Sequence, residues 1–185
     1  MKILERKWMS LMKKLSLILF KFIVLIFFIL SNPAYSEVKF IKSDVNKVVV
    51  TDGDTIKIGR EKIRLFGIDA PEMNQICNDQ NNNPYACGHV SKKFLSDFLY
   101  IQNSGKQIYC YHSERDKYKR IIGECFIGTI SETNINRIMV FHGRAVAYLK
   151  YSEKYLDAQN IAKNKKMGIW NGTFDLPEEW RKKNK

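Results

Sequence analysis

The chain has 185 residues, and its 31 Lys and Arg side chains outnumber its 19 Asp and Glu side chains, which gives a formal net charge of +12. This basic surplus favours a polyanionic partner such as nucleic acid or anionic lipid. No internal repeat or long linker is present, and the length is sufficient for one domain with a hydrophobic core but not for two.

Residues 1–36 have the pattern of a secretory signal peptide. Basic residues open the segment, an apolar run covers residues 15–30, and Ala34-Tyr35-Ser36 places small residues two apart, the pattern that a signal peptidase reads. The uninterrupted apolar core, residues 22–30, is shorter than the roughly 20 residues of a membrane span. We therefore expect cleavage after Ser36 and export to the periplasm or the medium. The alternative is an uncleaved segment that anchors the protein in the membrane.

Without residues 1–36 the chain keeps 149 residues. Setting aside the six basic residues and one acidic residue of that segment leaves 25 basic against 18 acidic side chains, a net charge of +7. We expect residues 37–185 to form one domain that still suits a nucleic-acid partner. We also expect this domain to be a monomer without stable membrane association after cleavage.

Five segments of this domain have the pattern of β-strands. They combine β-branched residues with partial alternation of apolar and polar positions, and turn residues such as Asp52-Gly53 and Gly59-Arg60 bound them. The predicted strands are residues 45–50, 55–58, 63–68, 107–111 and 121–127.

Three segments predict helices. Apolar residues recur at helical spacing between Val90 and Leu99. Residues 135–141 predict a second, short helix with Thr133 or Asn134 as its N-cap, and residues 152–167 predict a third that Gly168 ends. A helix after the third strand and two helices behind the fifth indicate an α+β fold, mainly a small β-barrel with helices packed against it.

Four cysteines lie beyond residue 36, an even number that suits disulfide formation in an exported chain. Cys77 and Cys87 flank a polar loop that predicts a turn, and Cys110 and Cys125 lie on predicted strands that antiparallel pairing would bring together. Four cysteines allow three pairings, of which we predict the two local ones, Cys77–Cys87 and Cys110–Cys125. The alternatives are a zinc site, disfavoured because no Cys-x-x-Cys is present and the histidines are scattered, and four buried thiols.

Carboxylates concentrate around the second and third predicted strands. Asp54 begins one strand, whereas Asp69 and Glu72 follow the end of the next, so pairing of these strands can gather them at one edge. Oxygen-rich clusters bind hard cations such as calcium, and Pro71 holds Ala70 extended, which leaves its carbonyl as a further ligand. The plain alternatives are a hairpin turn at Asp54 and solvated acids after the strand. We favour a cation-binding site, because otherwise several unrelated local features would have to occur together by chance within one short stretch of chain.

These motifs resemble the signature of the staphylococcal nuclease (thermonuclease) family, and the cysteines resemble an exported branch of it. The matching segments follow in order along nearly the whole chain after residue 36. They are Asp52-Gly53-Asp54-Thr55, residues 64–72 (Arg-Leu-Phe-Gly-Ile-Asp-Ala-Pro-Glu), residues 116–120 (Asp-Lys-Tyr-Lys-Arg), residues 143–148 (Gly-Arg-Ala-Val-Ala-Tyr) and residues 167–170 (Met-Gly-Ile-Trp). The resemblance implies an OB-fold five-stranded barrel with three helices.

The resemblance further implies a calcium-dependent endonuclease that hydrolyses phosphodiester bonds of DNA or RNA with little sequence specificity. Calcium would be bound by Asp54, Asp69 and the carbonyl of Ala70, and Glu72 would orient or deprotonate the attacking water. The other implied roles are phosphate binding by Arg64 and Arg120, and lining of the nucleotide site by Lys117, Tyr118 and a tyrosine from the region of Tyr148 and Tyr151.

Three departures from the family pattern affect these expectations. Ala70 stands where the type member has threonine, which a backbone ligand tolerates. Lys119 stands where glycine usually precedes the second arginine, so the local turn is expected to differ. Substrate contacts of residues 73–88 cannot be transferred, and Trp180-Arg181 fits the cysteine-containing branch without an assignable chemistry.

Two other functions remain as alternatives. A non-catalytic nucleic-acid-binding module is the first, because OB-folds also serve that role. A pure binder, however, has no need for Asp54, Glu72 and Arg120 together. A basic protein of the membrane surface is the second, and residues 37–185 lack the amphipathic helix with large apolar anchors that it requires.

Overall fold

The computed structural model describes residue 9 and residues 12–24, 39–128 and 132–184, and the chain divides into two compact units, Met1–Ser36 and Glu37–Lys185. In the first unit residues 12–24 are helical. Among the described helices, none has both the length and the apolar character to cross a membrane. The expected cleavage motif, residues 34–36, lies outside the described residues, so processing stays a prediction.

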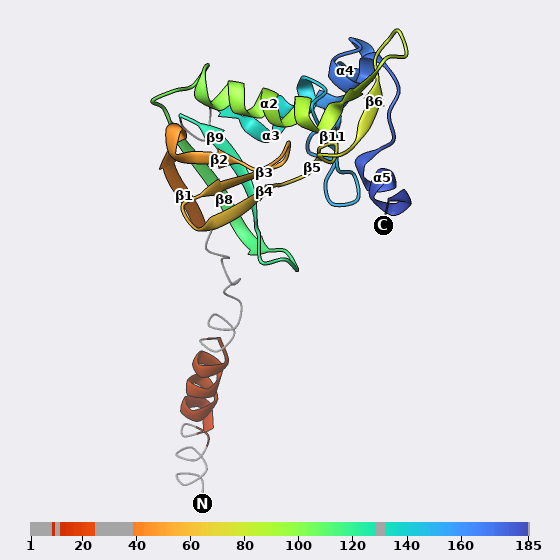
Figure 1. Ribbon diagram of the computed structural model, residues 1–185. Coiled ribbons are helices and arrows are strands. Elements are labelled where there is room, and N and C mark those ends of the chain that lie inside the picture. Colours follow the sequence, from red (N-terminus) through yellow and green to blue (C-terminus); the bar gives the residue numbers. More distant parts are fainter. Residues whose placement is uncertain (1–8, 10–11, 25–38, 129–131, 185) are drawn as a thin grey trace, which may run out of the picture. The chain divides into compact units, whose positions relative to one another are not determined.

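The second unit is built on a curled mixed sheet (Figure 1). Its strand order is β1-β8-β9-β4-β3-β2, and these neighbours are antiparallel except for the parallel pair β4 and β9. The strands are β1 (Lys39–Asp44), β2 (Val48–Val50), β3 (Thr55–Ile58), β4 (Glu61–Leu65), β8 (Gln107–Arg115) and β9 (Ile121–Ile127). β10 (Thr133–Asn134) adds to β9 outside this order.

One bent segment closes the sheet into a barrel. A 3-10 turn, η1 (Val45–Lys47), separates β1 from β2, and Asp44 caps it by accepting a hydrogen bond from the backbone N of Asn46. β1 pairs with β8 and β2 pairs with β3, so β1 and β2 are the two outer strands of the sheet. Because η1 alone separates them in the chain, the two edges of the sheet meet there. This closure confirms the predicted small OB-type barrel. The predicted strand over residues 45–50 is correct only from Val48, and β1 was not predicted.

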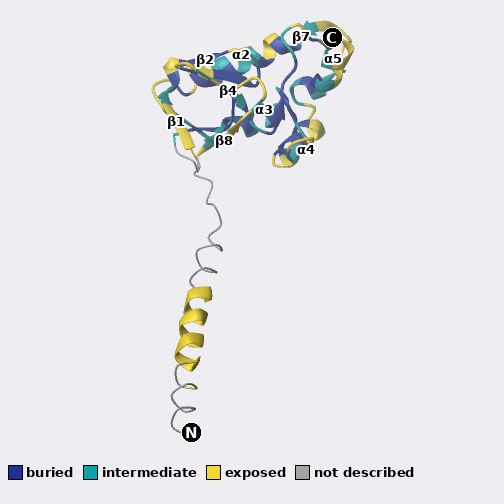
Figure 2. Ribbon diagram, turned by 90° about the horizontal axis from the view of Figure 1, so that it is seen from below, coloured by how far each residue is buried: buried dark blue, intermediate teal, exposed yellow. Residues whose placement is uncertain are grey.

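Alternate residues of the strands fill the barrel core. Ile56, Ile63, Ile108 and Ile121 are at most 1% exposed, and Figure 2 shows the buried residues inside the barrel and beneath the helices. α2 (Cys87–Tyr100) adds Leu95 and Leu99 to this core. Burial of each such side chain contributes about 1.5–3 kcal/mol relative to exposure, so apolar burial holds the strands in register.

The other helices follow the barrel strands. Asn134 caps α3 (Ile135–Phe141) by accepting a hydrogen bond from the backbone N of Arg137, as predicted. α4 (Leu156–Asn164) begins later than the predicted residue 152, because the Ser152 hydroxyl accepts from the backbone N of Lys154 and holds a turn there. It ends before Lys166 and Gly168, both at positive φ, and η2 (Gly168–Asn171) follows. α5 (Pro177–Lys183) was not predicted.

The third predicted strand, residues 63–68, is broken at Gly67. This glycine has φ of +71°, and the backbone N of Phe66 donates to the carbonyl of Gly123 on β9. The chain therefore leaves β4 and forms β5 (Ile68–Asp69), which pairs with β11 (Val146–Ala147) in a separate two-stranded sheet. The break carries Asp69 away from the barrel wall to its edge.

Both predicted disulfides are present. Cys77 and Cys87 join with a Cα–Cα distance of 5.7 Å, and Cys110 joins Cys125, its direct partner across β8 and β9, with a Cα–Cα distance of 4.0 Å. The loop between the first two cysteines is more ordered than the predicted turn. It forms a hairpin of β6 (Ile76–Asn78) and β7 (Pro84–Ala86), in which Asp79 accepts hydrogen bonds from turn backbone N–H groups.

Candidate active site

The turn before β3 places Asp54 inside the protein. The Asp52 carboxylate accepts a hydrogen bond of 3.0 Å from the backbone N of Asp54 and closes the turn. A Cβ atom at Gly53 would lie 2.7 Å from the Cβ of Ala70 and 2.8 Å from that of Ser91, so only glycine allows this approach. Asp54 is consequently 5% exposed and faces the β5 segment.

Three charged side chains meet where β3, β4 and β5 approach one another. Arg64, on β4, forms an ion pair with Asp54 and a second one of 2.7 Å with Asp69. Both carboxylates are almost fully buried. The backbone N of Ala70 also donates a hydrogen bond of 2.7 Å to Asp54. The structure therefore brings Asp54, Arg64, Asp69 and the backbone of Ala70 into one cluster.

Burial and charge act against each other in this cluster. Burial lowers the pKa of Arg64, and the neighbouring Asp69 charge opposes that effect. Burial likewise raises the pKa of Asp52, while the charge of Arg64 acts to lower it. A guanidinium whose ordinary pKa exceeds 12 remains protonated, so Arg64 supplies a fixed positive charge between two acids.

Arg120 is held by its own turn between β8 and β9. Its guanidinium donates to the carboxylate of Asp116 at 2.8 Å, and the same carboxylate accepts hydrogen bonds from the backbone N atoms of Tyr118 and Arg120. Lys119 adopts φ of +64°, so it provides the left-handed conformation that glycine usually supplies. Repulsion from Arg120 contributes to the lowered pKa of Arg64, which puts the two arginines within electrostatic range.

The predicted nucleotide-lining residues lie in two groups, all exposed except the half-buried Tyr148. Tyr118 is 68% exposed, with the Lys117 ammonium 5.1 Å from its ring centre. Tyr148 and Tyr151 pack edge to face with ring centres 4.8 Å apart. The backbone N of Tyr148 donates to the carbonyl of Gly67, and burial together with the Asp69 charge raises the Tyr148 pKa. Tyr148 is therefore the tyrosine nearer to the carboxylates.

Arg181 is a site residue to which the sequence assigned no role. Its guanidinium, on α5, contacts both carboxylate oxygens of Asp69 at 2.9 Å and the carboxylate of Glu72 at 2.7 Å. Glu72 is thus joined to the buried cluster through Arg181. The sequence pointed to this residue only through the pair Trp180-Arg181, and no motif relates that pair to Asp69 or Glu72.

The donor atoms of the cluster fit a hard cation. Asp54 and Asp69 offer carboxylate oxygens and Ala70 a backbone carbonyl, and oxygen-only sets of this kind suit calcium or magnesium. Over the described residues, no group of three or more His, Cys, Asp or Glu side chains is arranged to hold a metal. A metal here would therefore rely on two carboxylates, a carbonyl and water.

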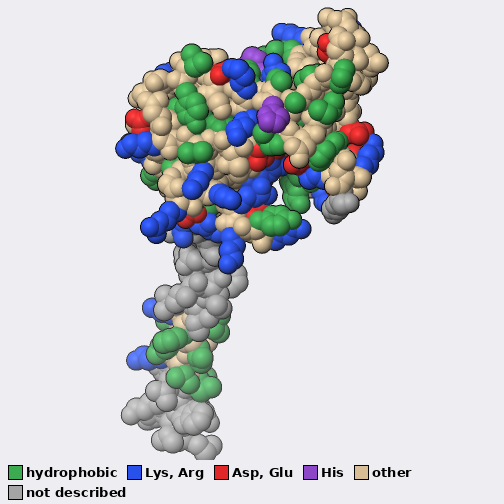
Figure 3. Space-filling model, in the orientation of Figure 1, with side chains coloured by type: hydrophobic (Ala, Val, Ile, Leu, Met, Phe, Trp, Pro, Cys, Tyr) green, Lys and Arg blue, Asp and Glu red, His purple; other side chains and the backbone are tan. Residues whose placement is uncertain are grey.

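In the face of the molecule seen in Figure 3, Lys and Arg side chains gather over part of the barrel domain, with Asp and Glu side chains among them. Such a distribution attracts a polyanion. The barrel, its buried arginine–carboxylate cluster and these basic side chains together fit the class of small barrel proteins with a negatively charged partner.

Comparison with known proteins identifies the family. The family model described as "Staphylococcal nuclease homologue" matches residues 62–172. A protein named micrococcal nuclease from Shigella flexneri is 31% identical over 173 residues, which cover 85% of this chain and 88% of that protein. The chain therefore belongs to the staphylococcal nuclease family, and this membership makes it a hydrolase of the endonuclease type.

Two further relatives support the assignment. An uncharacterized endonuclease from Escherichia coli is 30% identical over 165 residues, which cover 85% of this chain and 94% of that protein. A succinoglycan biosynthesis protein, ExoI, from Rhizobium meliloti (strain 1021) is 35% identical over 127 residues, which cover 68% of this chain and 64% of that protein. The family thus includes relatives whose names refer to different processes.

Proposed function

We propose that this protein is an exported, calcium-dependent endonuclease that cleaves DNA or RNA with little sequence specificity. The observation that carries the proposal is the buried cluster of Asp54, Arg64 and Asp69, placed beside Glu72 at the barrel edge. A buried set of opposite charges contributes little net stability, so its presence favours a chemical role over a folding role.

Calcium would be held by Asp54, Asp69 and the carbonyl of Ala70. When bound, it supplies a positive charge that polarises the phosphoryl group and orients a water molecule. The rigid turn at Asp52 and the hydrogen bond from Ala70 to Asp54 fix the two ligand segments against each other before any ligand arrives. Preorganisation of this kind avoids a reorganisation cost during the reaction.

The arginines provide charge for the transition state. Hydrolysis of a phosphodiester adds negative charge to the equatorial phosphoryl oxygens, and a planar guanidinium can donate to two of them at once. Arg64 lies in the cluster, and its charge interacts with that of Arg120. The proposed role of both arginines is to bind one phosphate. Groups that interact more strongly with the transition state than with the substrate accelerate the reaction.

Glu72 is suited to accept the proton of the attacking water. Its carboxylate is 37% exposed, unlike the buried Asp69, so water can reach it. The proton passes from water to Glu72 while the new bond to phosphorus forms and the bond to the leaving oxygen breaks. The exposed Tyr118 and the half-buried Tyr148 can stack on a base, and stacking and phosphate contacts discriminate weakly between sequences.

The test compares single-turnover cleavage of single- and double-stranded DNA and RNA at saturating calcium. Replacing Arg120 with Ala should slow cleavage by about 100- to 1000-fold, because one preorganised donor is lost. Arg64→Lys should behave similarly, since lysine lacks the guanidinium fork. Asp54→Ala should instead weaken calcium binding in calorimetry. Arg137→Ala is the matched control, because Arg137 forms an exposed ion pair with Asp157 on the helices.

Two outcomes would contradict the proposal. A wild-type protein that binds nucleic acid but cleaves no faster with calcium than Arg120→Ala would be a binding module instead. Cleavage confined to one sequence motif would contradict the proposed breadth of substrates.

A further inference from the structure

The C-terminal helix α5 brings a third arginine to the two acids that flank the proposed metal and water positions. Arg181 Nη1 and Nη2 each contact one oxygen of Asp69 at 2.9 Å, and Nη1 also contacts Glu72 at 2.7 Å. Asp69 is 1% exposed, so this is an ion pair with one buried partner rather than a surface pair. Arg181 and Asp69 are 112 residues apart in sequence.

The segment before α5 is fastened to the disulfide hairpin. Asn78 on β6 exchanges two backbone hydrogen bonds with Thr173, of 2.9 and 3.1 Å. A Cβ atom at Gly172 would lie 1.9 Å from the carbonyl of Asn78, so the two backbones are in direct contact. The disulfide Cys77–Cys87 ties the same hairpin to the start of α2. The position of α5 is thus defined by backbone contacts.

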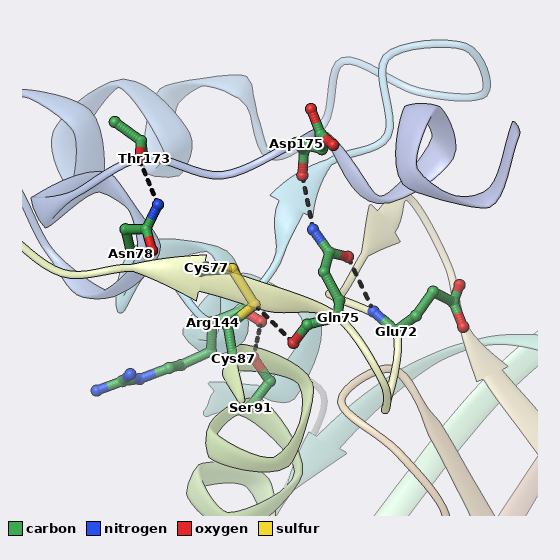
Figure 4. Close-up of a disulfide and its surroundings, with 9 residues drawn as sticks. All are labelled: Glu72, Gln75, Cys77, Asn78, Cys87, Ser91, Arg144, Thr173 and Asp175. Atoms are coloured by element: carbon green, nitrogen blue, oxygen red, sulfur yellow. Dashed lines mark hydrogen bonds between the residues drawn. A yellow bond between two sulfur atoms is a disulfide. The ribbon is translucent and has the colours of Figure 1, made fainter. Parts of the chain in front are cut away.

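Gln75 links this segment to Glu72 (Figure 4). Its side chain is fully buried; its amide oxygen accepts from the backbone N of Glu72 at 3.1 Å, and its amide nitrogen donates to the carbonyl of Asp175 at 2.8 Å. A single side chain therefore fixes the backbone of Glu72 relative to the segment that carries Arg181. The Glu72 side chain receives its own fixed contact from Arg181.

A guanidinium is suited to this arrangement. Asp69 and Glu72 repel each other when ionised, and one planar cation that contacts both offsets that repulsion. Burial alone would lower the pKa of Arg181, but hydrogen bonds from its guanidinium to Asp69 and Glu72 raise it above its ordinary range. The fork geometry also selects one orientation of each carboxylate, which a point charge such as lysine does not.

We propose that Arg181 is a positioning residue of the active site: it holds the Glu72 carboxylate in place relative to Asp69, and α5 is therefore part of the catalytic machinery. This inference rests on the proposed nuclease function. Arg181 acts through Glu72, so its loss should lower the turnover rate rather than substrate affinity. Because Arg181 occupies both oxygens of Asp69, it also competes with a cation, so its loss should not weaken calcium binding.

The competing explanation is that Arg181 only fastens α5 to the domain. Other contacts already hold this segment, because Lys150 pairs with Glu178 on α5 at 3.6 Å and the preceding Asn78–Thr173 backbone pair joins the segment to the hairpin, while Lys183–Asp175 and Lys182–Glu178 are pairs within the segment. These ion pairs are at the surface, whereas Arg181 alone among them reaches the carboxylates of the site. Lys182→Ala therefore removes one positive charge from the same helix without touching the site.

The experiment measures kcat, KM and calcium affinity for the full-length domain and for Arg181→Ala, Arg181→Lys and Lys182→Ala. For Arg181→Ala we expect kcat to fall about 10- to 100-fold, the usual effect of losing a group that orients a ligand or base. KM should stay within about twofold, and the calcium dissociation constant from calorimetry should be unchanged or smaller. Arg181→Lys should recover little of the rate, and Lys182→Ala should match the wild type.

Several results would overturn the inference. If Arg181→Ala has the kcat of the wild type, Arg181 only attaches α5 to the domain and has no positioning role. A raised KM with unchanged kcat would make Arg181 a substrate ligand, and a parallel loss of kcat and calcium affinity would make it a support of the metal site. Circular dichroism would detect unfolding of Arg181→Ala. In that case the kcat of Arg181→Lys tests the positioning role instead, and a wild-type kcat in Arg181→Lys would contradict it. A wild-type protein that binds calcium but cleaves no nucleic acid would contradict the proposed nuclease function, whatever the Arg181 variants do. The positioning role of Arg181 would then be wrong as well, because an unchanged calcium affinity in Arg181→Ala does not by itself support a catalytic role.

Discussion

At the scale of single residues, a few backbone conformations decide where the charged groups lie. Lys119 is the clearest case, because its φ of +64° lets Asp116 accept hydrogen bonds from two backbone N atoms and from Arg120. A side chain other than glycine in this left-handed region costs about 1–2 kcal/mol. The turn therefore keeps Arg120 in place at the expense of stability.

Replacing Lys119 with Gly should relieve that cost. Glycine loses more backbone entropy on folding, which removes about 0.5–1 kcal/mol of the gain. We therefore expect a net stabilisation of up to about 1 kcal/mol, or about 2–4 °C in Tm for a domain of this size, measured by scanning calorimetry. Lys117→Gly, at a position without positive φ, is the control and should lower Tm. A lower Tm for Lys119→Gly would contradict the strain at this turn.

At the scale of elements, one carboxylate fastens α4 to the barrel. Glu124 on β9 accepts hydrogen bonds from the Tyr155 hydroxyl at 2.5 Å, from Lys154 at 2.7 Å and from Asn134 at 2.8 Å. Burial alone would raise the pKa of Glu124, but these hydrogen bonds outweigh it and lower the pKa below the ordinary value of 4.5. Tyr155 is fully buried, and burial and the bond to Glu124 raise its pKa, so it remains a neutral donor.

The substitution Glu124→Gln should destabilise the domain in a pH-dependent way. A carboxylate whose folded pKa is lowered stabilises the protein above its unfolded pKa, 4.5, and this contribution is lost as the pH falls through the lowered folded value. We expect a loss of about 1–2 kcal/mol in the free energy of unfolding at pH 7 and a smaller difference at pH 3, measured by urea titration. Glu179→Gln on α5, an exposed position, is the control. An equal loss at both pH values would show that the charge of Glu124 has no part in the contact.

At the scale of the whole molecule, the two disulfides agree with the proposed export, because disulfides form and persist in oxidising compartments. The hairpin disulfide Cys77–Cys87 lies beside Gln75, whose backbone carbonyl is in contact with the Cys87 sulfur at 3.4 Å. The second disulfide joins β8 to β9 in the barrel core. The redox state of the compartment therefore affects a crosslink in the barrel and a crosslink beside the segment that carries Glu72.

We predict that the exported protein begins at Glu37 and carries both disulfides. Intact mass spectrometry without reduction checks both features at once, since each disulfide removes two hydrogens. Residues 37–185 produced in a reducing cytosol serve as the control and should carry free thiols. A membrane-retained, full-length product would contradict the processing, and a peptide linking Cys77 to Cys110 would contradict the pairing.

Several elements of the fold could be predicted from the sequence, because their bounds depend on neighbouring residues. Residues 55–58, 121–127 and 135–141 have the predicted bounds, because a strand bounded by turn residues or a helix with a capping Asn is specified by its own neighbours. In two of the segments that failed, a distant contact overrides local preference. η1 interrupts a β-branched run where Val45 hydrogen-bonds to Lys106, and Gly67 divides a predicted strand because Phe66 bonds to β9.

The same division applies to the site. The sequence by itself indicated that Asp54 and Asp69 lie close together, because turns and one hairpin connect the two segments that carry them. Only the tertiary structure decided that Arg181 reaches Asp69 and Glu72 and that Gln75 joins Glu72 to Asp175. The physical reason is separation along the chain: contacts across about a hundred residues depend on how the barrel closes and where the disulfide hairpin packs, and no local spacing records them.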